Sequence, residues 1–149
     1  MDIKSSEERS KNMAAIHSKN TKPEIYLRKL LFARGYRYGV NSKSVPGHPD
    51  IYMRKYNTAI FVHGCFWHRH RGCKYAYVPK SNIEFWKKKF QDNIERDVEV
   101  KSELGKVGIK EVIIWECTIK EMKENERRKV CCLRKIKRII NEGTMYLEV

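Results

Sequence analysis

Apolar residues recur at helical spacing in three stretches of the chain: residues 22–34, residues 82–104, and a stretch that ends before Gly143. Gly35 and Gly105 follow the first two, as expected at helix ends. Serine or threonine followed three residues later by glutamate predicts four helix starts, at Ser5 and Glu8, Thr21 and Glu24, Ser81 and Glu84, and Thr118 and Glu121. The pattern therefore predicts four helices, one of them close to the N-terminus.

Short runs rich in aromatic and β-branched residues predict the strands, at residues 36–40, 51–53, 58–62, 109–115 and 144–147. The run from Val112 to Trp115 is apolar throughout, which indicates a central strand buried on both faces. Three strands in sequence, then a helix that crosses over to another strand, predict an α/β fold with a mixed sheet flanked by helices.

The chain of 149 residues has the length of one domain. No apolar run approaches the roughly 18 residues of a membrane span, and the first residues lack the apolar stretch of a secretion signal. We therefore expect a cytoplasmic protein whose five cysteines are thiols or metal ligands. The adjacent Cys131 and Cys132 are interpreted as core residues.

Basic residues dominate the charge, with 32 Lys and Arg against 18 Asp and Glu, a net charge of +14. Between Glu24 and Glu84 the only carboxylate is Asp50. Such a segment is expected to attract a polyanion such as DNA, although a solvated basic surface would have the same composition. Alone among positive charges along the chain, Asp50 is expected to stay ionised.

Cysteine and histidine are concentrated after the strand predicted at 58–62. Cys65, His70 and Cys73 can supply three ligands to a tetrahedral zinc ion, and Cys117 can supply the fourth if strands 58–62 and 109–115 are neighbours. Spacing alone leaves open whether His63, His68 or His70 is the histidine ligand. The alternative is that these cysteines are small buried apolar residues.

Asp50 opens one strand of a predicted hairpin, beside the point where the next strand ends at Val62 and His63. A carboxylate in that position can bind Mg²⁺, which activates water toward a phosphodiester. His68 can then accept a proton, with Asp97 as the residue that orients it. The alternative is that Asp50 is only a turn residue.

Aromatic residues are interleaved with basic ones in the same region. Phe66 and Trp67 in the loop and Trp86 in the following helix are surrounded by arginine and lysine, a composition suited to stacking on bases while holding phosphates. For four other aromatic residues we predict core packing instead, namely Phe61, Phe85, Phe90 and Trp115.

These motifs resemble the Vsr endonucleases of very-short-patch repair. The resemblance lies in Phe61-Val62-His63-Gly64-Cys65-Phe66-Trp67-His68 with Pro46-Gly47-His48-Pro49-Asp50 upstream. Residues 9–13, 84–86, 93–97 and 115–117 match in the same order, so the likeness covers about residues 8–118. It implies one domain, 1–149, with a PD-(D/E)xK (restriction-endonuclease-like) core and a structural zinc site. Residues 1–20 would contact DNA, 21–118 would form the catalytic core, and 119–149 a C-terminal helix.

The resemblance implies an enzyme that nicks one DNA strand 5′ to the thymine of a T:G mismatch, the product of 5-methylcytosine deamination. Asp50 and the Val62 carbonyl would bind Mg²⁺, Glu24 and His63 would hold metal-bound waters, and His68 would be the general base, oriented by Asp97. The implied zinc ligands are Cys65, His70, Cys73 and Cys117. The residues implied to contact DNA are Met13, Phe66, Trp67, Trp86, Lys89 and Asn93.

Three features depart from the family pattern. Val62 stands where the best-known members have threonine, the loop between His68 and Cys73 is one residue longer than expected, and Glu24 also fits a capping box. Two alternatives stay open: a zinc-stabilised DNA-binding module without turnover, and a nickase not restricted to T:G mismatches. The expected partner is double-stranded DNA, with mismatch-repair proteins and a cytosine-5 methyltransferase as functional companions. We expect a monomer that associates with the nucleoid through DNA.

Overall fold

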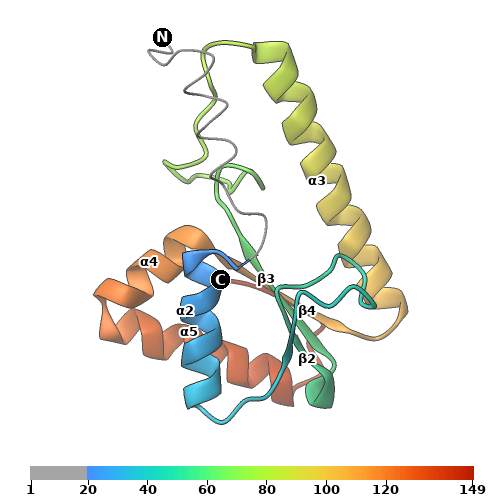
Figure 1. Ribbon diagram of the computed structural model, residues 1–149, viewed down its shortest axis with the longest axis vertical. Helices are drawn as coiled ribbons and strands as arrows, with labels where there is room; N and C mark the ends of the chain where they lie inside the picture. Colours follow the sequence, from blue (N-terminus) through green and yellow to red (C-terminus); the bar gives the residue numbers. More distant parts are fainter. Residues whose placement is uncertain (1–19) are drawn as a thin grey trace.

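Five short strands form one mixed sheet in the computed structural model, which describes residues 20–149 (Figure 1). In this part of the chain the elements are α2 (Lys22–Ala33), β1 (Gly39–Val40), β2 (Ile51–Met53), the 3-10 turn η1 (Arg54–Tyr56), β3 (Thr58–His63), α3 (Ile83–Lys106), β4 (Lys110–Trp115), α4 (Glu116–Glu124), α5 (Glu126–Asn141) and β5 (Tyr146–Glu148). The strand order is β1-β2-β3-β4-β5. The first two pairings are antiparallel and the last two parallel, which confirms the mixed α/β architecture predicted from the sequence.

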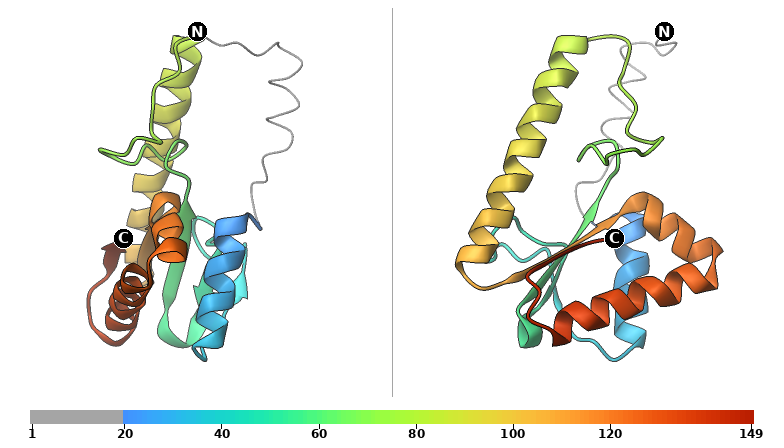
Figure 2. Two further views of the ribbon diagram at one scale, coloured as in Figure 1. Left: turned by 90° about the vertical axis from the view of Figure 1, so that its left-hand side faces the viewer. Right: turned by 180° about the vertical axis from the view of Figure 1, so that it is seen from behind.

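The helices cover the two faces of the sheet unequally. Alternate residues of a strand point to opposite faces, so Ile60 of β3 packs with α2, α4 and α5, whereas Phe61 packs with Leu104 of α3. We call the side under α2, α4 and α5 the first face and the side under α3 the second face. Figures 1 and 2 show α3 on one side of the strands and the other three helices on the opposite side.

The parallel pairing of β3 with β4 determines where the loops emerge. His63 at the end of β3 lies opposite Trp115 at the end of β4. The segments that follow both strands therefore start at the same edge of the sheet. This confirms the neighbour relation on which the predicted contribution of Cys117 depended.

Several predicted elements agree with the structure to within a few residues. Helix α2 begins at Lys22 as predicted, and Gly35 behind it adopts φ +91°, a conformation that glycine accepts without strain. Strand β1 is shorter than predicted, with only Gly39 and Val40. The expected first helix, with Ser5 and Glu8, lies outside the described residues.

The C-terminal region contains two helices and a strand, where a single helix was predicted with at most a short strand after it. Helix α4 follows β4 without a loop, so Thr118 lies inside the helix and is not its cap. Asn125 has extended dihedral angles (φ −136°, ψ 112°) and separates α4 from α5, and its side chain accepts the backbone N–H of Arg128. The predicted cap at Ser81 is also wrong, because Asn82 precedes α3 and makes no side-chain capping bond.

Most of α3 is exposed. Only Phe90 and Leu104 of this helix are buried, because its N-terminal half extends beyond the sheet (Figures 1 and 2). The predicted core position of Phe85 is therefore wrong, since this side chain is 61% exposed. Of the adjacent cysteines in α5, Cys132 is buried but Cys131 is exposed, so the core interpretation holds for Cys132 alone. Among the described helices, none has both the length and the apolar character needed to cross a bilayer.

Candidate active site and metal centre

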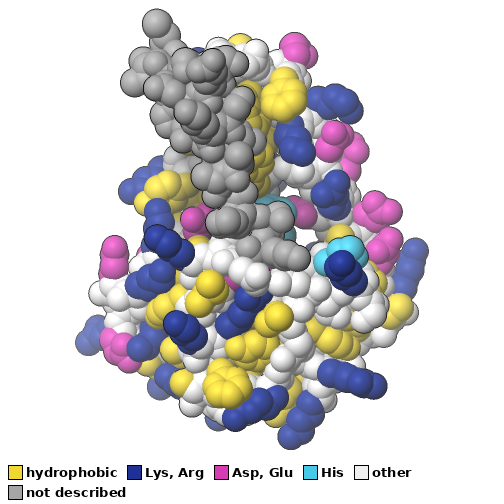
Figure 3. Space-filling model, in the orientation of Figure 1, with side chains coloured by type: hydrophobic (Ala, Val, Ile, Leu, Met, Phe, Trp, Pro, Cys, Tyr) yellow, Lys and Arg dark blue, Asp and Glu magenta, His cyan; other side chains and the backbone are white. Residues whose placement is uncertain are grey.

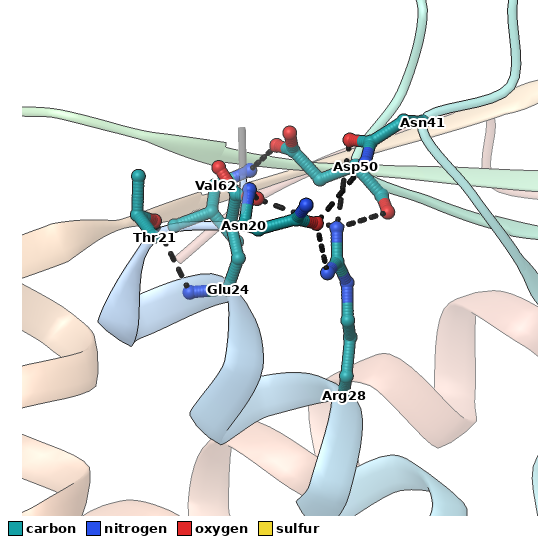
Figure 4. A network of polar contacts seen from close by, with 7 residues as sticks. All are labelled: Asn20, Thr21, Glu24, Arg28, Asn41, Asp50 and Val62. Atoms are coloured by element: carbon teal, nitrogen blue, oxygen red, sulfur yellow. Dashed lines mark hydrogen bonds and ion pairs between the residues drawn. The ribbon is translucent and has the colours of Figure 1, made fainter. Parts of the chain in front are cut away.

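Asp50 lies directly before β2 and contacts the end of β3. Its Oδ2 accepts a 2.7 Å hydrogen bond from the backbone N–H of Val62 (Figure 4). The antiparallel register of β2 and β3 places Asp50 there, as predicted from the hairpin. Since one carboxylate oxygen takes the Val62 bond, the other can bind a cation.

Glu24 of α2 lies close to Asp50. Its side chain is buried, and Oε2 accepts the N–H of Asn20 at 2.7 Å and pairs with Arg28 at 3.3 Å. The backbone N–H of Glu24 donates to Thr21 Oγ1 at 3.5 Å, so Thr21 caps α2. The capping box is thus only half formed, since the Glu24 carboxylate bonds the N–H one residue before the cap.

The two carboxyl groups are electrostatically coupled. Burial raises the pKa of Asp50 to about 7; the Val62 N–H lowers it, and the negative charge of Glu24 raises it. Burial, and to a lesser extent Glu24, raises this pKa against the surrounding positive charge, so the basic composition of the segment does not by itself keep Asp50 ionised. A bound cation would relieve both the burial cost and the repulsion, so this pair fits a metal site.

Arg28 connects this carboxyl pair to its surroundings. Its guanidinium group donates to the Asp50 carbonyl oxygen at 3.3 Å and to Asn41 Oδ1 at 3.5 Å, in addition to its pairing with Glu24 (Figure 4). Sequence reasoning missed this residue, although its position four residues after Glu24 in a helix was a usable signal. The sequence carries no comparable signal for Asn41.

A second group of titratable residues includes His63, which follows Val62 at the end of β3. His68 Nδ1 lies 2.8 Å from Asp97 Oδ2, and the His68 ring stacks on the His63 ring at a centroid distance of 3.7 Å. Burial and the neighbouring His68 lower the pKa of His63 to about 3, which keeps His63 neutral. Because Nδ1 of His68 donates to the carboxylate, its Nε2 carries the lone pair that can accept a proton.

Four potential metal ligands meet beside Trp115. One ligand atom from each residue lies within 4.8 Å of all the others, in the set Cys65, His70, Cys73 and Cys117. The Nδ1 of His70 is 3.4 Å from the Cys117 sulfur. Three sulfurs and one imidazole nitrogen at these separations fit a tetrahedral metal ion.

The structure places His70, and neither His63 nor His68, with the three cysteines. The extra residue in the loop does not displace it, since the His70 ring stacks on Trp115 at 4.1 Å. Burial raises the pKa of the Cys65 thiol to about 12, so this sulfur would need a bound metal to become a thiolate near neutral pH. His63, His68 and Asp97 form a separate group that can also bind a cation, although the His68–Asp97 hydrogen bond occupies one ligand atom of each.

Aromatic rings pack together where the loop after β3 meets α3. The centre of the Phe66 ring lies 5.2 Å from that of Trp67, 5.4 Å from that of Trp86 and 5.2 Å from that of Phe90. Phe66, Trp67 and Trp86 are only partly buried, so their rings remain available to a ligand, whereas Phe90 is buried. The exposed side chain of Lys89 lies on the same helix, and Met13 lies outside the described residues.

Two polar residues support this cluster. The guanidinium of Arg69 lies 3.8 Å from the centre of the Phe90 ring and donates to the carbonyl oxygens of Phe66, Ala76 and Tyr77. Asn93 donates from Nδ2 to the Trp67 carbonyl oxygen at 2.9 Å. In this structure Asn93 therefore positions the loop that carries Trp67. The role of Arg69 was missed, because only its charge could be seen in the sequence.

Basic side chains are scattered over one face of the molecule (Figure 3). On the face shown in Figure 3, lysine and arginine are spread across the surface instead of forming one patch. The net charge of +14 favours a polyanionic partner in general terms, without indicating where it would bind.

Comparison with known proteins identifies the family to which the chain belongs. Residues 1–74 match the family described as DNA mismatch endonuclease Vsr. The chain is 43% identical to the Type II nicking enzyme V.NmeAIP of Neisseria meningitidis serogroup A, with 95% of each chain covered. It is 38% identical to the Type II nicking enzyme V.XorIIP of Xanthomonas oryzae pv. oryzae (85% of this chain and 93% of the relative), and 40% identical to the DNA mismatch endonuclease Vsr of Escherichia coli K12 (80% and 76%). The chain therefore belongs to the DNA mismatch endonuclease Vsr family.

Proposed function

We propose that this protein is a Mg²⁺-dependent DNA mismatch endonuclease that nicks one strand 5′ to the thymine of a T:G mismatch and so starts very-short-patch repair. The observation that carries the proposal is the meeting of two groups at the end of β3. The half-buried Asp50, which lies beside the buried Glu24, contacts Val62, and the His68–Asp97 pair adjoins His63. Relatives named as mismatch and nicking endonucleases support the same reading, and with it a restriction-endonuclease-like core.

The residues would divide the reaction between them. Asp50 and the carbonyl oxygen of Val62 would hold the Mg²⁺ ion, which when bound would stabilise the charge that develops on the scissile phosphate. Replacement of threonine by Val62 leaves that backbone carbonyl unchanged. Glu24 and the neutral His63 would hold water molecules near it.

His68 would act as the general base. Its Nε2 takes the proton of the attacking water while Nδ1–H donates to Asp97, which fixes the ring orientation and stabilises the positive charge that forms. The water oxygen forms a bond to phosphorus, and the bond from phosphorus to the 3′ oxygen breaks. That oxygen takes up a proton from solvent.

A zinc ion held by Cys65, His70, Cys73 and Cys117 would support the loop that carries the aromatic residues. Phe66 and Trp67 lie in this loop and contact Trp86, so we propose that the three rings wedge into the duplex beside the mismatch. Lys89 would contact the DNA there. Asn93 would contribute by holding the Trp67 backbone.

The test uses labelled duplexes that differ only in one T:G or one T:A pair, with protein and Mg²⁺. We expect nicking of the T:G duplex alone. Asp50→Asn keeps an oxygen for the Val62 N–H but removes the charge, so it should abolish nicking while mismatch binding persists. Loss of binding as well would contradict the role given to Asp50, and equal nicking of both duplexes would contradict mismatch specificity.

A DNA-binding module without turnover is the second candidate, and the same duplexes test it. That module would bind the T:G duplex without nicking it, with or without Mg²⁺. Metal analysis of the purified protein should give one zinc per chain, and well-folded protein without zinc would overturn the zinc site. The His68–Asp97 contact favours the enzyme, because a binding module has no use for an oriented base.

A further inference from the structure

One indole ring contacts both histidine-containing groups of the site. Trp115, at the end of β4, is 6% exposed. Its ring stacks on His70 at 4.1 Å and 7°, and meets His63 edge to face at 5.4 Å and 71°. The orientation of this indole therefore affects His70, which lies with the three cysteines, and His63, which stacks on His68.

Glu148 of β5 determines how that indole is held. Its Oε1 accepts the Nε1–H of Trp115 at 2.7 Å. The contact depends on the pairing of β5 with β4, in which the Val149 N–H donates to the Ile113 carbonyl at 2.9 Å and the Trp115 N–H donates to the Val149 carbonyl at 3.0 Å. The second carboxylate oxygen of Glu148 accepts the hydroxyl of Tyr146 at 2.9 Å.

We propose that Glu148 is a positioning residue that acts through Trp115 on His63 and His70 together. A short hydrogen bond to a charged acceptor restricts rotation of the indole, and the stacked rings transmit that restriction to both imidazoles. Outer contacts of this kind commonly govern how firmly a metal is held and how precisely a site is aligned. The inference deepens the proposed function and rests on it.

The main variant is Glu148→Ala in the full-length protein. The maximal rate of T:G nicking should fall about tenfold, as is typical when an outer contact of a metal site is lost. The KM for the duplex should stay unchanged, because the rings of Phe66, Trp67 and Trp86 are not contacted by Glu148. Zinc release to a chelator should accelerate by a similar factor, and in NMR spectra the Trp115 indole N–H should lose its protection from exchange.

Two further variants separate this role from a general effect on β5. Glu148→Gln keeps an oxygen acceptor for the indole N–H and should restore the nicking rate to within about twofold of wild type. Tyr146→Phe removes the other hydrogen bond of the same carboxylate and leaves Trp115 bonded. It should therefore resemble wild type, and a loss as large as that of Glu148→Ala would overturn the proposal.

A double-mutant cycle with Trp115→Phe gives the sharpest test. Phenylalanine keeps a ring for stacking but has no N–H, so adding Glu148→Ala to it should change neither the nicking rate nor zinc release further. Additive effects would overturn the proposal, since Glu148 would then act by another route. If wild-type protein binds zinc but does not nick, the proposed function fails, and zinc release decides the inference: equal release from wild type and Glu148→Ala overturns it.

Discussion

The two faces of the sheet bury different kinds of residue. The first face, under α2, α4 and α5, buries the larger apolar cluster, with Leu31, Ile60 and Ile114 fully buried. Its helices also carry two buried polar residues, Glu24 of α2 and Thr118 of α4. The second face also buries large apolar residues, but it adds the polar side chains of His63 and Glu111. Of the described helices, α3 covers it with its C-terminal part, together with Val45 and the loop that carries Cys65.

The two faces therefore differ in their share of apolar burial and in the ionisable groups that the strands themselves bury. Apolar burial on the first face contributes roughly 25 cal/mol for each Å² removed from water, whereas a buried ionisable group costs free energy unless a partner or an ion compensates it. Strand β3 serves both, since Ile60 points into the first face and Phe61 and His63 follow on the second. The first face can thus hold the strand in place while the second retains groups that stability alone would not favour.

Truncation on the first face should have the largest effect. Ile114 is fully buried, and Ile114→Ala should lower the free energy of unfolding by about 3–4 kcal/mol, because it loses apolar contact and leaves a cavity. Urea unfolding of the variant and the wild type measures this. Val98→Ala, at a side chain that is 64% exposed, is the control and should stay within about 0.5 kcal/mol. Similar losses in both variants would contradict the claim that apolar burial on the first face stabilises the fold.

Removal of a charge on the second face should affect activity and leave stability alone. Asp97→Asn keeps the shape of the side chain but no longer stabilises a positively charged His68, so nicking should fall about a hundredfold. Asp92→Asn on the same helix removes a carboxylate that, within residues 20–149, pairs with Lys88 alone at 3.5 Å, and it should nick normally. Single-turnover nicking with thermal unfolding as a companion measurement checks both. A drop in stability that accounts for the lost nicking would show that Asp97 serves the fold.

Glu111 should make the stability of the second face depend on pH. Burial raises the pKa of Glu111 from 4.5 to about 7, while Lys101 lowers it and Asp97 and Glu148 raise it. The raised pKa stabilises the folded protein below pH 4.5, and this contribution disappears as the pH rises through about 7. Glu111→Gln should therefore exceed the wild type by about 2 kcal/mol at pH 8.5 and match it near pH 5, as measured by urea unfolding. An equal difference at both pH values would contradict a titrating Glu111.

Local patterns in the sequence predicted the features that depend on residues close together along the chain. Periodicity and turn residues located α2, β2, β3 and β4 almost to the residue, and the spacing of Cys65 and Cys73 predicted a ligand cluster. The hairpin register was also sufficient to bring Asp50 to Val62.

Contacts that depend on tertiary packing could not be predicted in this way. The proximity of Glu24 to Asp50 requires the packing of α2 against the sheet. Burial of Asp50 and, to a lesser extent, this proximity raise the pKa of Asp50, which the local composition did not predict. The hydrogen bond from Trp115 to Glu148 requires the parallel docking of β5, which no sequence motif marks. The choice of His70 likewise depends on the folded loop and on stacking against Trp115.

The smallest effect on stability is expected at Phe85. Periodicity wrongly predicted a core position for this residue, because the pattern does not show that α3 extends beyond the sheet. Phe85→Ala should change the free energy of unfolding by less than about 0.5 kcal/mol, since this ring is 61% exposed and contacts Trp86 at its edge. Phe90→Ala, five residues further along and 8% exposed, should cost about 3 kcal/mol and serves as the matched comparison. Urea unfolding of the pair locates the point at which α3 joins the core. Equal losses would extend the second face to the start of the helix, and the sharp boundary between its packed and exposed halves would then be wrong.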